Sequence, residues 1–105
     1  GSHGEEVTFK AGNYILNSYK QLPHQGHAYY GNYYNAQATF QLGGKYWKRF
    51  APWMYDTYLP QQQEDGSWEG NQGSTYTTAM MVLAFAVPYR QLPIYQRDET
   101  VGEEE

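Results

Sequence analysis

Five tyrosines near the starts of two predicted helices are the side chains of this sequence best suited to meet a ligand: Tyr29, Tyr30, Tyr33, Tyr34 and Tyr76. Aromatic faces can stack on a polyisoprenoid or a sugar, and they can stabilise a carbocation by cation–π attraction. Tyrosine pairs are also good packing units between helices. The sequence therefore leaves two interpretations open, a ligand-binding lining and a helix-packing surface.

The acidic residues do not form a catalytic pair. Asp65 precedes Gly66, and Asp followed by Gly is typical of a turn. Asp56 falls on the polar face of a predicted helix, where we expect it to be solvated. The sequence therefore predicts no catalytic acid in this chain.

Metal ligands and nucleophiles are not assembled by the sequence either. The absence of cysteine excludes disulfides, thiolate catalysis and cysteine-ligated metal. His24 and His27 lie in a loop that contains Pro and Gly, without the third ligand that a zinc site requires. Three serines lack the surroundings of a nucleophile elbow: Ser18, Ser67 and Ser74. We expect no catalytic residue, no metal and no cofactor.

Length and charge narrow the class of protein. The chain has 105 residues, enough for one small domain. Its net charge is −4 and its Lys and Arg residues are scattered, so a nucleic-acid partner gains no support. The longest apolar run, 79–87, is shorter than the roughly 18 residues that a membrane span needs. Residues 1–4 resemble a tag remnant, which leaves the natural N-terminus and any leader open.

Apolar spacing predicts four helices, over residues 5–19, 28–42, 45–59 and 75–87. The last is apolar nearly all round, which predicts burial on most sides. Pro52 either kinks the third helix or marks its first turn. The predicted apolar stripes of the first three helices are Val7, Ala11, Tyr14, Ile15 and Ser18; Tyr29, Tyr33, Ala36 and Phe40; and Trp47, Phe50, Ala51, Met54 and Tyr58.

The remaining segments are predicted to be irregular. Residues 20–27 form a loop, and 88–97 lie extended or fray because of two prolines. We take 5–97 as the domain and 98–105 as an acidic, flexible tail. Between the third and fourth helices, the sequence predicts a corner. Asp65 and Gly66 form its turn, and the amide of Gln62 and the ring of Trp68 hold it in place.

This corner, read as Gln-x-x-Asp-Gly-Ser-Trp over 62–68, resembles the QW repeat of the squalene cyclase and prenyltransferase superfamily. The flanks over 29–47, 76–80 and 88–97 resemble bacterial proteins with the prenyltransferase and squalene oxidase repeat, so the resemblance covers about 28–97. It implies an α/α toroid in which 28–42 and 75–87 are inner helices and 5–19 and 45–59 are outer helices. It also implies that Gln62 and Trp68 join neighbouring repeats, and that the tyrosine cluster approaches a central cavity.

The chain departs from the enzymes of that superfamily at their catalytic motifs. It has no DXDD sequence, the motif with which squalene-type cyclases protonate an alkene. It also lacks the Asp, Cys and His ligands with which prenyltransferase β-subunits bind zinc. A parent enzyme would therefore have to supply its acid from another segment.

A weak internal repeat relates the two halves of the chain with an offset of 43 residues. It aligns Val7 with Phe50, Ala11 with Met54, Leu16 with Leu59, Tyr33 with Tyr76, Asn35 with Thr78, Ala36 with Ala79 and Phe40 with Leu83. Two helix pairs cannot close a ring, and each repeat of a solenoid buries its face on neighbours. We therefore expect either the C-terminal piece of a longer protein or self-association.

Together these observations predict an all-α chain built from two α-hairpin repeats of an α/α toroid. The resemblance implies a terpenoid-cyclase-like or isoprenoid-binding repeat domain without its own catalytic acid. Two alternatives stay open. One is a structural or protein-interaction repeat module, and the other is an aromatic-lined carbohydrate-binding module.

Overall fold

The structure is a computed structural model that describes residues 2–90, with the side chains of residues 4–89. These residues form helices without a strand, so the all-α prediction is confirmed. The toroidal repeat stays a prediction. In chain order the helices are α1 (Ser2–Ser18), η1 (Tyr19–His24), α2 (Ala28–Leu42), α3 (Gly44–Tyr58), η2 (Leu59–Gln61), α4 (Ser74–Phe85) and α5 (Val87–Arg90).

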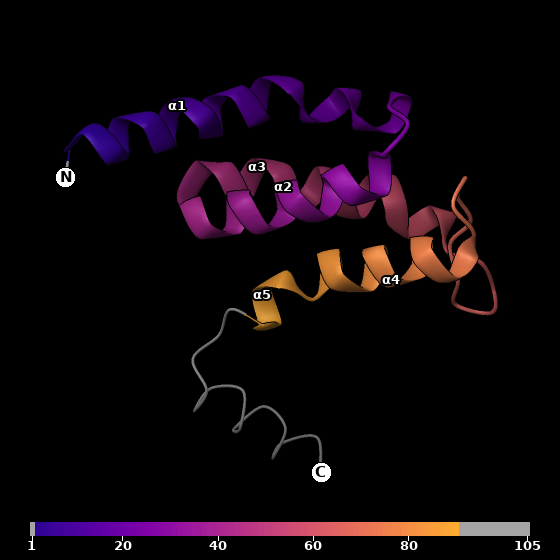
Figure 1. The fold of residues 1–105 in the computed structure, drawn as a ribbon. Coiled ribbons are helices and arrows are strands. Elements are labelled where there is room, and N and C mark those ends of the chain that lie inside the picture. The colour runs from indigo at the N-terminus through magenta and orange to yellow at the C-terminus, as the bar shows by residue number, and fades with distance from the viewer. Residues whose placement is uncertain (1, 91–105) are drawn as a thin grey trace, which may run out of the picture.

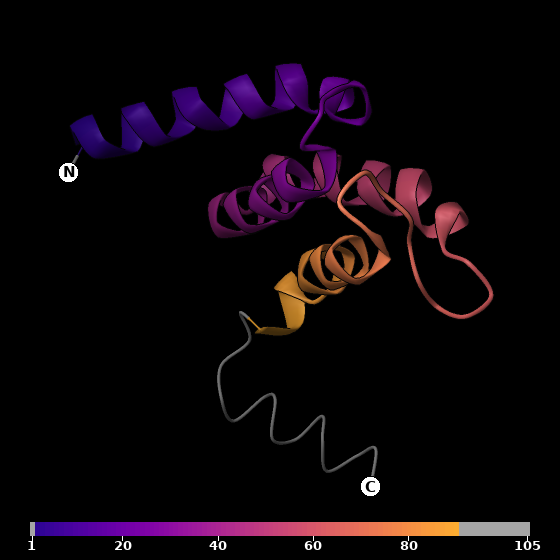
Figure 2. The same cartoon turned by 45° about the vertical axis from the view of Figure 1, so that its right-hand side comes forward.

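Helix α2 is the centre of the arrangement. It contacts α1, α3 and α4, and its most extensive contacts are with α4 and α3 (Figure 1). Helix α1 also contacts α3, and Figure 2 shows the same order of helices from a second direction. The two helices predicted to be inner ones, α2 and α4, therefore lie side by side. The two predicted outer ones, α1 and α3, are also neighbours.

The predicted boundaries agree closely with the four long helices. The prediction for α2 agrees at both ends, since Gly43 with a φ of 70° ends the helix and its N–H donates to the Thr39 carbonyl. Pro52 lies inside α3 and faces the surface, so it does not mark the first turn of this helix.

The stripe predicted for the first helix is wrong. Val7 and Tyr14 are 68% and 73% exposed, and Ala11 is exposed as well. The face that α1 buries instead carries Gly12 and Leu16, and it continues into η1 at Tyr19. Periodicity selected the most apolar stripe, whereas packing against α2 and α3 selects the stripe that fits them.

Two further expectations need correction. Residues 20–27 are not all loop, because burial of Tyr19 and Leu22 orders a 3-10 helix over Tyr19–His24. Helix α4 is less buried than predicted, since Val82 is 56% exposed and Ala79 is exposed too.

The predicted tail over 88–97 is described only in part. Residues 88–90 belong to α5 and are therefore helical rather than extended. Residues 91–97 and the predicted acidic tail over 98–105 lie outside the described residues. Within the described part, no helix combines the length and hydrophobicity needed to cross a membrane.

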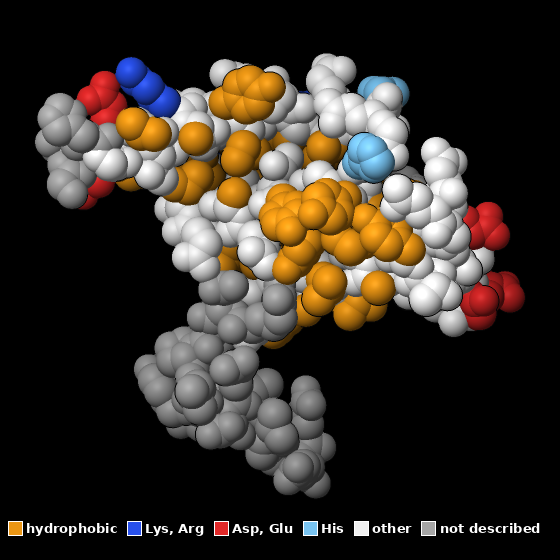
Figure 3. All heavy atoms as spheres, in the orientation of Figure 1, with side chains coloured by type: hydrophobic (Ala, Val, Ile, Leu, Met, Phe, Trp, Pro, Cys, Tyr) orange, Lys and Arg blue, Asp and Glu red, His pale blue; other side chains and the backbone are white. Residues whose placement is uncertain are grey.

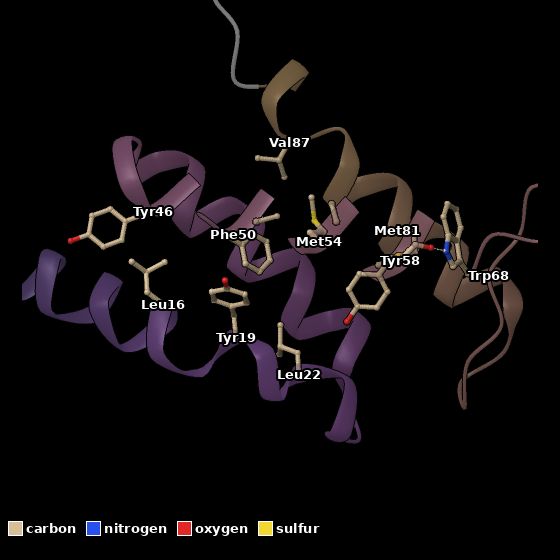
Figure 4. Packing of buried hydrophobic residues seen from close by; sticks show 12 residues of the cluster. Leu16, Tyr19, Leu22, Tyr46, Phe50, Met54, Tyr58, Trp68, Met81 and Val87 are labelled. Atoms are coloured by element: carbon tan, nitrogen blue, oxygen red, sulfur yellow. Dashed lines mark hydrogen bonds between the residues drawn. The ribbon is translucent and has the colours of Figure 1, made fainter. Parts of the chain in front are cut away.

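The core is largely aromatic and lies between α1, α2, α3 and α4 (Figure 4). Phe50 and Met54 of α3 are fully buried, as predicted for this stripe. The ring of Tyr19 packs edge-on against Phe50, with centroids 5.5 Å apart. Such pairs add about 0.5–1.5 kcal/mol to the free energy gained by burial alone. Aromatic contacts thus account for much of the tyrosine content.

Trp68 connects the end of α3 to α4. It is only 3% exposed, and its indole Nε1–H donates to the Tyr58 carbonyl at 2.7 Å. The last carbonyls of a helix have no partner within the helix, so this bond satisfies one of them. The backbone N–H of Trp68 donates to Thr78 Oγ1 at 2.9 Å, and its ring packs against Phe85. Trp68 therefore fixes α4 relative to α3.

The chain turns just before Trp68 through a compact hydrogen-bonded loop. Asp65 Oδ1 accepts the hydroxyl of Ser67 at 2.6 Å and its backbone N–H at 3.0 Å, and these bonds lower the pKa of Asp65. Gly66 has a φ of 90°, a conformation that side chains disfavour. Gln62 Nε2 donates to the Gly66 carbonyl at 2.9 Å. These contacts lie within the α3–α4 pair, and a role of Gln62 and Trp68 in joining neighbouring repeats stays a prediction.

We predict that Trp68→Phe lowers the free energy of unfolding by about 2–3 kcal/mol, because the buried Tyr58 carbonyl loses its partner and the ring shrinks. The measurement is urea denaturation followed by circular dichroism. Trp47→Phe is the matched control, because Trp47 is only half-buried and packs edge-on against Phe40. An equal loss in both variants would contradict a special role for the Trp68 bond.

Candidate functional site

A cleft of about 330 Å³ opens where the start of α2, the end of α3 and the loop before α4 meet. Its wall combines aromatic rings with amide and other polar side chains. The rings belong to Tyr29, Tyr30, Tyr58 and Tyr76, and the polar side chains are those of Gln25, His27, Gln61, Glu69, Asn71, Gln72 and Thr77.

Three of the five tyrosines predicted to meet a ligand line this cleft. They are Tyr29 and Tyr30 from α2 and Tyr76 from α4, so the fold brings together residues separated by more than forty positions. Tyr33 and Tyr34 are not among the lining residues. The Tyr33 hydroxyl accepts a hydrogen bond from the Gln37 amide, and its ring centroid is 5.1 Å from that of Tyr34.

Tyr30 and Tyr34 form a pair on the surface of α2. The Tyr30 hydroxyl donates to the Tyr34 hydroxyl at 3.3 Å, and the ring centroids are 4.8 Å apart. This hydrogen bond, together with the charge that Tyr30 would carry when ionised, raises the pKa of Tyr34. Both rings remain about half exposed, so Tyr30 connects the cleft to an aromatic surface outside it.

Tyr29 is held in the wall of the cleft by contacts with two other segments. Its hydroxyl donates to the Glu69 carbonyl at 3.2 Å and lies 3.4 Å from Gln61 Oε1. Its ring centroid is 5.7 Å from that of Tyr58. These contacts hold the Tyr29 ring in place between α2 and the loop before α4, so one aromatic face of the cleft is preformed.

Gly70 lets that loop pass close to the ring. A Cβ atom at this position would lie 2.5 Å from Thr77 Oγ1 and 3.1 Å from the ring of Tyr29. Both distances are too short for ordinary contacts, so any side chain at position 70 would push the loop outward. The glycine therefore sets how closely the loop approaches α2 and α4.

Tyr58 is the most unusual residue of the cleft. It is 2% exposed, and its hydroxyl has no hydrogen-bond partner among the described residues. Figure 4 shows this hydroxyl on the side of the residue opposite to the carbonyl that binds Trp68. Burial first, and the nearby Tyr29 second, raise the pKa of Tyr58 to about 12. An unpaired buried hydroxyl costs about 1–3 kcal/mol, so a ligand that pairs with it would recover part of that cost.

A second side chain with unpaired polar atoms, Asn32, lies in α2. The side-chain amide of Asn32 is fully buried, and neither its nitrogen nor its oxygen has a partner within the described part of the chain. Asn32 is not among the residues that line the cleft. Residues 4–89 thus carry two buried side chains with unpaired polar atoms, and of these only Tyr58 lines the cleft.

The cleft does not assemble a metal centre. No group of three His, Cys, Asp or Glu side chains suited to a metal ion occurs within residues 4–89. His27 lines the cleft, while the side chains of His24 and Asp56 are exposed to solvent. The chemistry that these side chains offer is ligand binding. The rings can stack on a ligand, and the amides and the Tyr58 hydroxyl can form hydrogen bonds.

Sequence reasoning missed Tyr58 as a site residue, because its place on the apolar stripe of α3 indicated core packing. It also missed the polar residues over 69–72, which reach the cleft only because the loop folds back. A signal was present at Tyr58, because the apolar stripe carries its hydroxyl into the interior, where a polar group normally needs a hydrogen-bond partner.

No family model, curated protein or solved structure matches the chain in comparisons with known proteins. The function proposed below therefore rests on the geometry of the cleft and on the residues that resemble a QW repeat.

We predict that stability falls with pH at the alkaline end partly because of Tyr58. An ordinary tyrosine has a pKa of about 10, whereas that of Tyr58 is about 12 in the folded chain. Between these values the unfolded chain has lost the proton and the folded chain still holds it. The free energy of unfolding should therefore be fully retained below pH 10 and decrease above it, by up to about 1.4 kcal/mol per pH unit from this residue.

Tyr58→Phe isolates this contribution, because other tyrosines titrate in the same range. Its free energy of unfolding should be about 1 kcal/mol higher than that of the original chain at neutral pH, since an unpaired buried hydroxyl is removed. The advantage should grow above pH 10. Denaturant titrations at neutral and alkaline pH measure both effects, and a destabilised variant at neutral pH would show that the hydroxyl has a partner.

Proposed function

We propose that the chain is a ligand-binding repeat domain of the squalene cyclase and prenyltransferase type that contributes no catalytic acid of its own. The observation that carries the proposal is the cleft itself, in which four tyrosines converge and the Tyr58 hydroxyl is buried without a partner. Concave sites with aromatic walls and a few directed polar groups are typical of small-molecule binding.

The arrangement of the helices supports the repeat part of the proposal. Helices α2 and α4 are in contact, as are α1 and α3. An offset of 43 residues relates α1 to α3 and α2 to α4. Two layers of equivalent helices are what a piece of an α/α toroid would contain. In such a toroid, the cleft at the starts of α2 and α4 would face the axis.

An isoprenoid is the ligand that the resemblance implies. The rings of Tyr29, Tyr30 and Tyr76 offer apolar faces to a hydrocarbon chain, and aromatic faces also attract a developing carbocation. The amides at the edge of the cleft could receive a polar head group. The chain lacks the DXDD motif of squalene-type cyclases, so the proposal is limited to binding.

A carbohydrate is a second candidate, favoured by the polar part of the wall. Gln25, Gln61, Asn71 and Gln72 provide amide donors and acceptors next to the tyrosine rings. Sugar rings present C–H faces that stack on aromatic side chains, and their hydroxyls pair with amides. The unpaired hydroxyl of Tyr58 would also find a partner in such a ligand, which it would not find in a hydrocarbon.

Titration with two probes tests the proposal and separates the two ligand classes. Farnesol represents isoprenoids and a cello-oligosaccharide represents sugars, and chemical shifts of the backbone amides report binding. We predict that Tyr30→Leu weakens binding of the true ligand about tenfold, the value of a well-packed aromatic contact. Tyr14→Leu is the matched control, because Tyr14 is exposed on α1 and does not line the cleft.

Tyr58→Phe then identifies the class. Loss of the hydroxyl should weaken a carbohydrate about tenfold and leave an isoprenoid unaffected, because only the carbohydrate can pair with it. Binding of neither probe, or equal weakening by Tyr14→Leu and Tyr30→Leu, would contradict a binding role for the cleft.

A further inference from the structure

Positions that are buried in one repeat are exposed at the equivalent place in the other. In α2, Asn32, Ala36 and Thr39 are fully buried. An offset of 43 residues carries this stripe onto Thr75, Ala79 and Val82 of α4, all of which are exposed, with Val82 at 56%. The neighbouring helices cover the stripe in α2. In α4 the same stripe faces solvent.

The outer helices show the converse relation. Phe50 and Met54 of α3 are fully buried, and the same offset carries them back onto Val7 and Ala11 of α1. Val7 is 68% exposed, and Ala11 is exposed as well. Figure 3 shows hydrophobic side chains on the visible surface over both α1 and α4.

Helices α2 and α3 pack directly on each other within the chain. The exposed stripe of α4 corresponds to a face of α2, and the exposed stripe of α1 corresponds to a face of α3. Each end of the chain therefore exposes a face whose counterpart is covered in the interior of the chain. Neither stripe contains a charged residue, so joining them would bury no unpaired charge.

We propose that a second copy of this chain packs head-to-tail on the first, with its α1 on the α4 stripe Thr75, Ala79 and Val82. The contact would repeat the packing of α3 on α2. An interface between two different faces of the same molecule leaves one face of each kind free at the ends of the pair. Further copies can then add until the assembly closes into a ring or extends as a filament.

The test is light scattering after size exclusion, at several concentrations, on the full chain and on two variants. Val7→Glu alters only the α1 face, and Val82→Glu alters only the α4 face. Both side chains are exposed in the single chain, so neither change should affect folding. Arg49→Glu is the control, because it adds negative charge at an exposed position of α3 outside both stripes.

The mass of the original chain should rise with concentration, and so should that of Arg49→Glu. Each of the two stripe variants alone should keep the mass of a single chain. An equimolar mixture of Val7→Glu with Val82→Glu should form a complex of two chains and no larger, because only one unaltered pair of faces is present. This rescue is specific to a head-to-tail contact.

Any of four results would overturn the proposal. They are a single-chain mass for the original chain at all concentrations, dissociation by only one stripe variant, a mixture that does not associate, or dissociation by Arg49→Glu. Binding of ligand in the cleft is measured with different variants, so the two proposals can fail separately.

Discussion

The bond between the Trp68 indole and the Tyr58 carbonyl is the constraint on which the second half of the molecule depends. Because it closes the end of α3, it fixes where the chain turns and where α4 begins. The same residue, Tyr58, sends its ring into the cleft, so the bond also orients the wall of the site. The corner between α3 and α4 and the proposed binding site thus share one residue, Tyr58.

Only the helices in the interior of the arrangement have their uncharged faces covered by neighbouring helices. Helix α2 is surrounded by α1, α3 and α4, whereas the terminal helices α1 and α4 each leave a stripe of uncharged residues exposed. A repeat that covers its neighbours must expose such faces at its ends unless capping residues replace them. The ligand proposed for the cleft and the copy proposed for the ends therefore meet different surfaces. The first is a cleft lined by tyrosine rings and amides, and the second is made of exposed, uncharged helix stripes.

Sequence reasoning found the helices because Gly, Pro and apolar periodicity mark them locally, as at Gly43 after α2. It could not choose the buried face of α1, because Val7 and Leu16 are both apolar and only the position of α2 and α3 decides between them. Of the five tyrosines predicted to meet a ligand, Tyr29, Tyr30 and Tyr76 line the cleft, and the binding role stays a prediction. Tyr58 and the loop over 69–72 were missed, since a long-range contact through Trp68 brings them there.

The most direct test of this account is hydrogen exchange of the Trp68 indole N–H, followed by NMR. If the bond to Tyr58 holds α3 and α4 together, this proton should exchange only through global unfolding, as slowly as the most protected backbone amides of α3. Exchange orders of magnitude faster than those amides would show that the corner opens by itself. The bond would then be a consequence of the fold rather than the constraint that organises it.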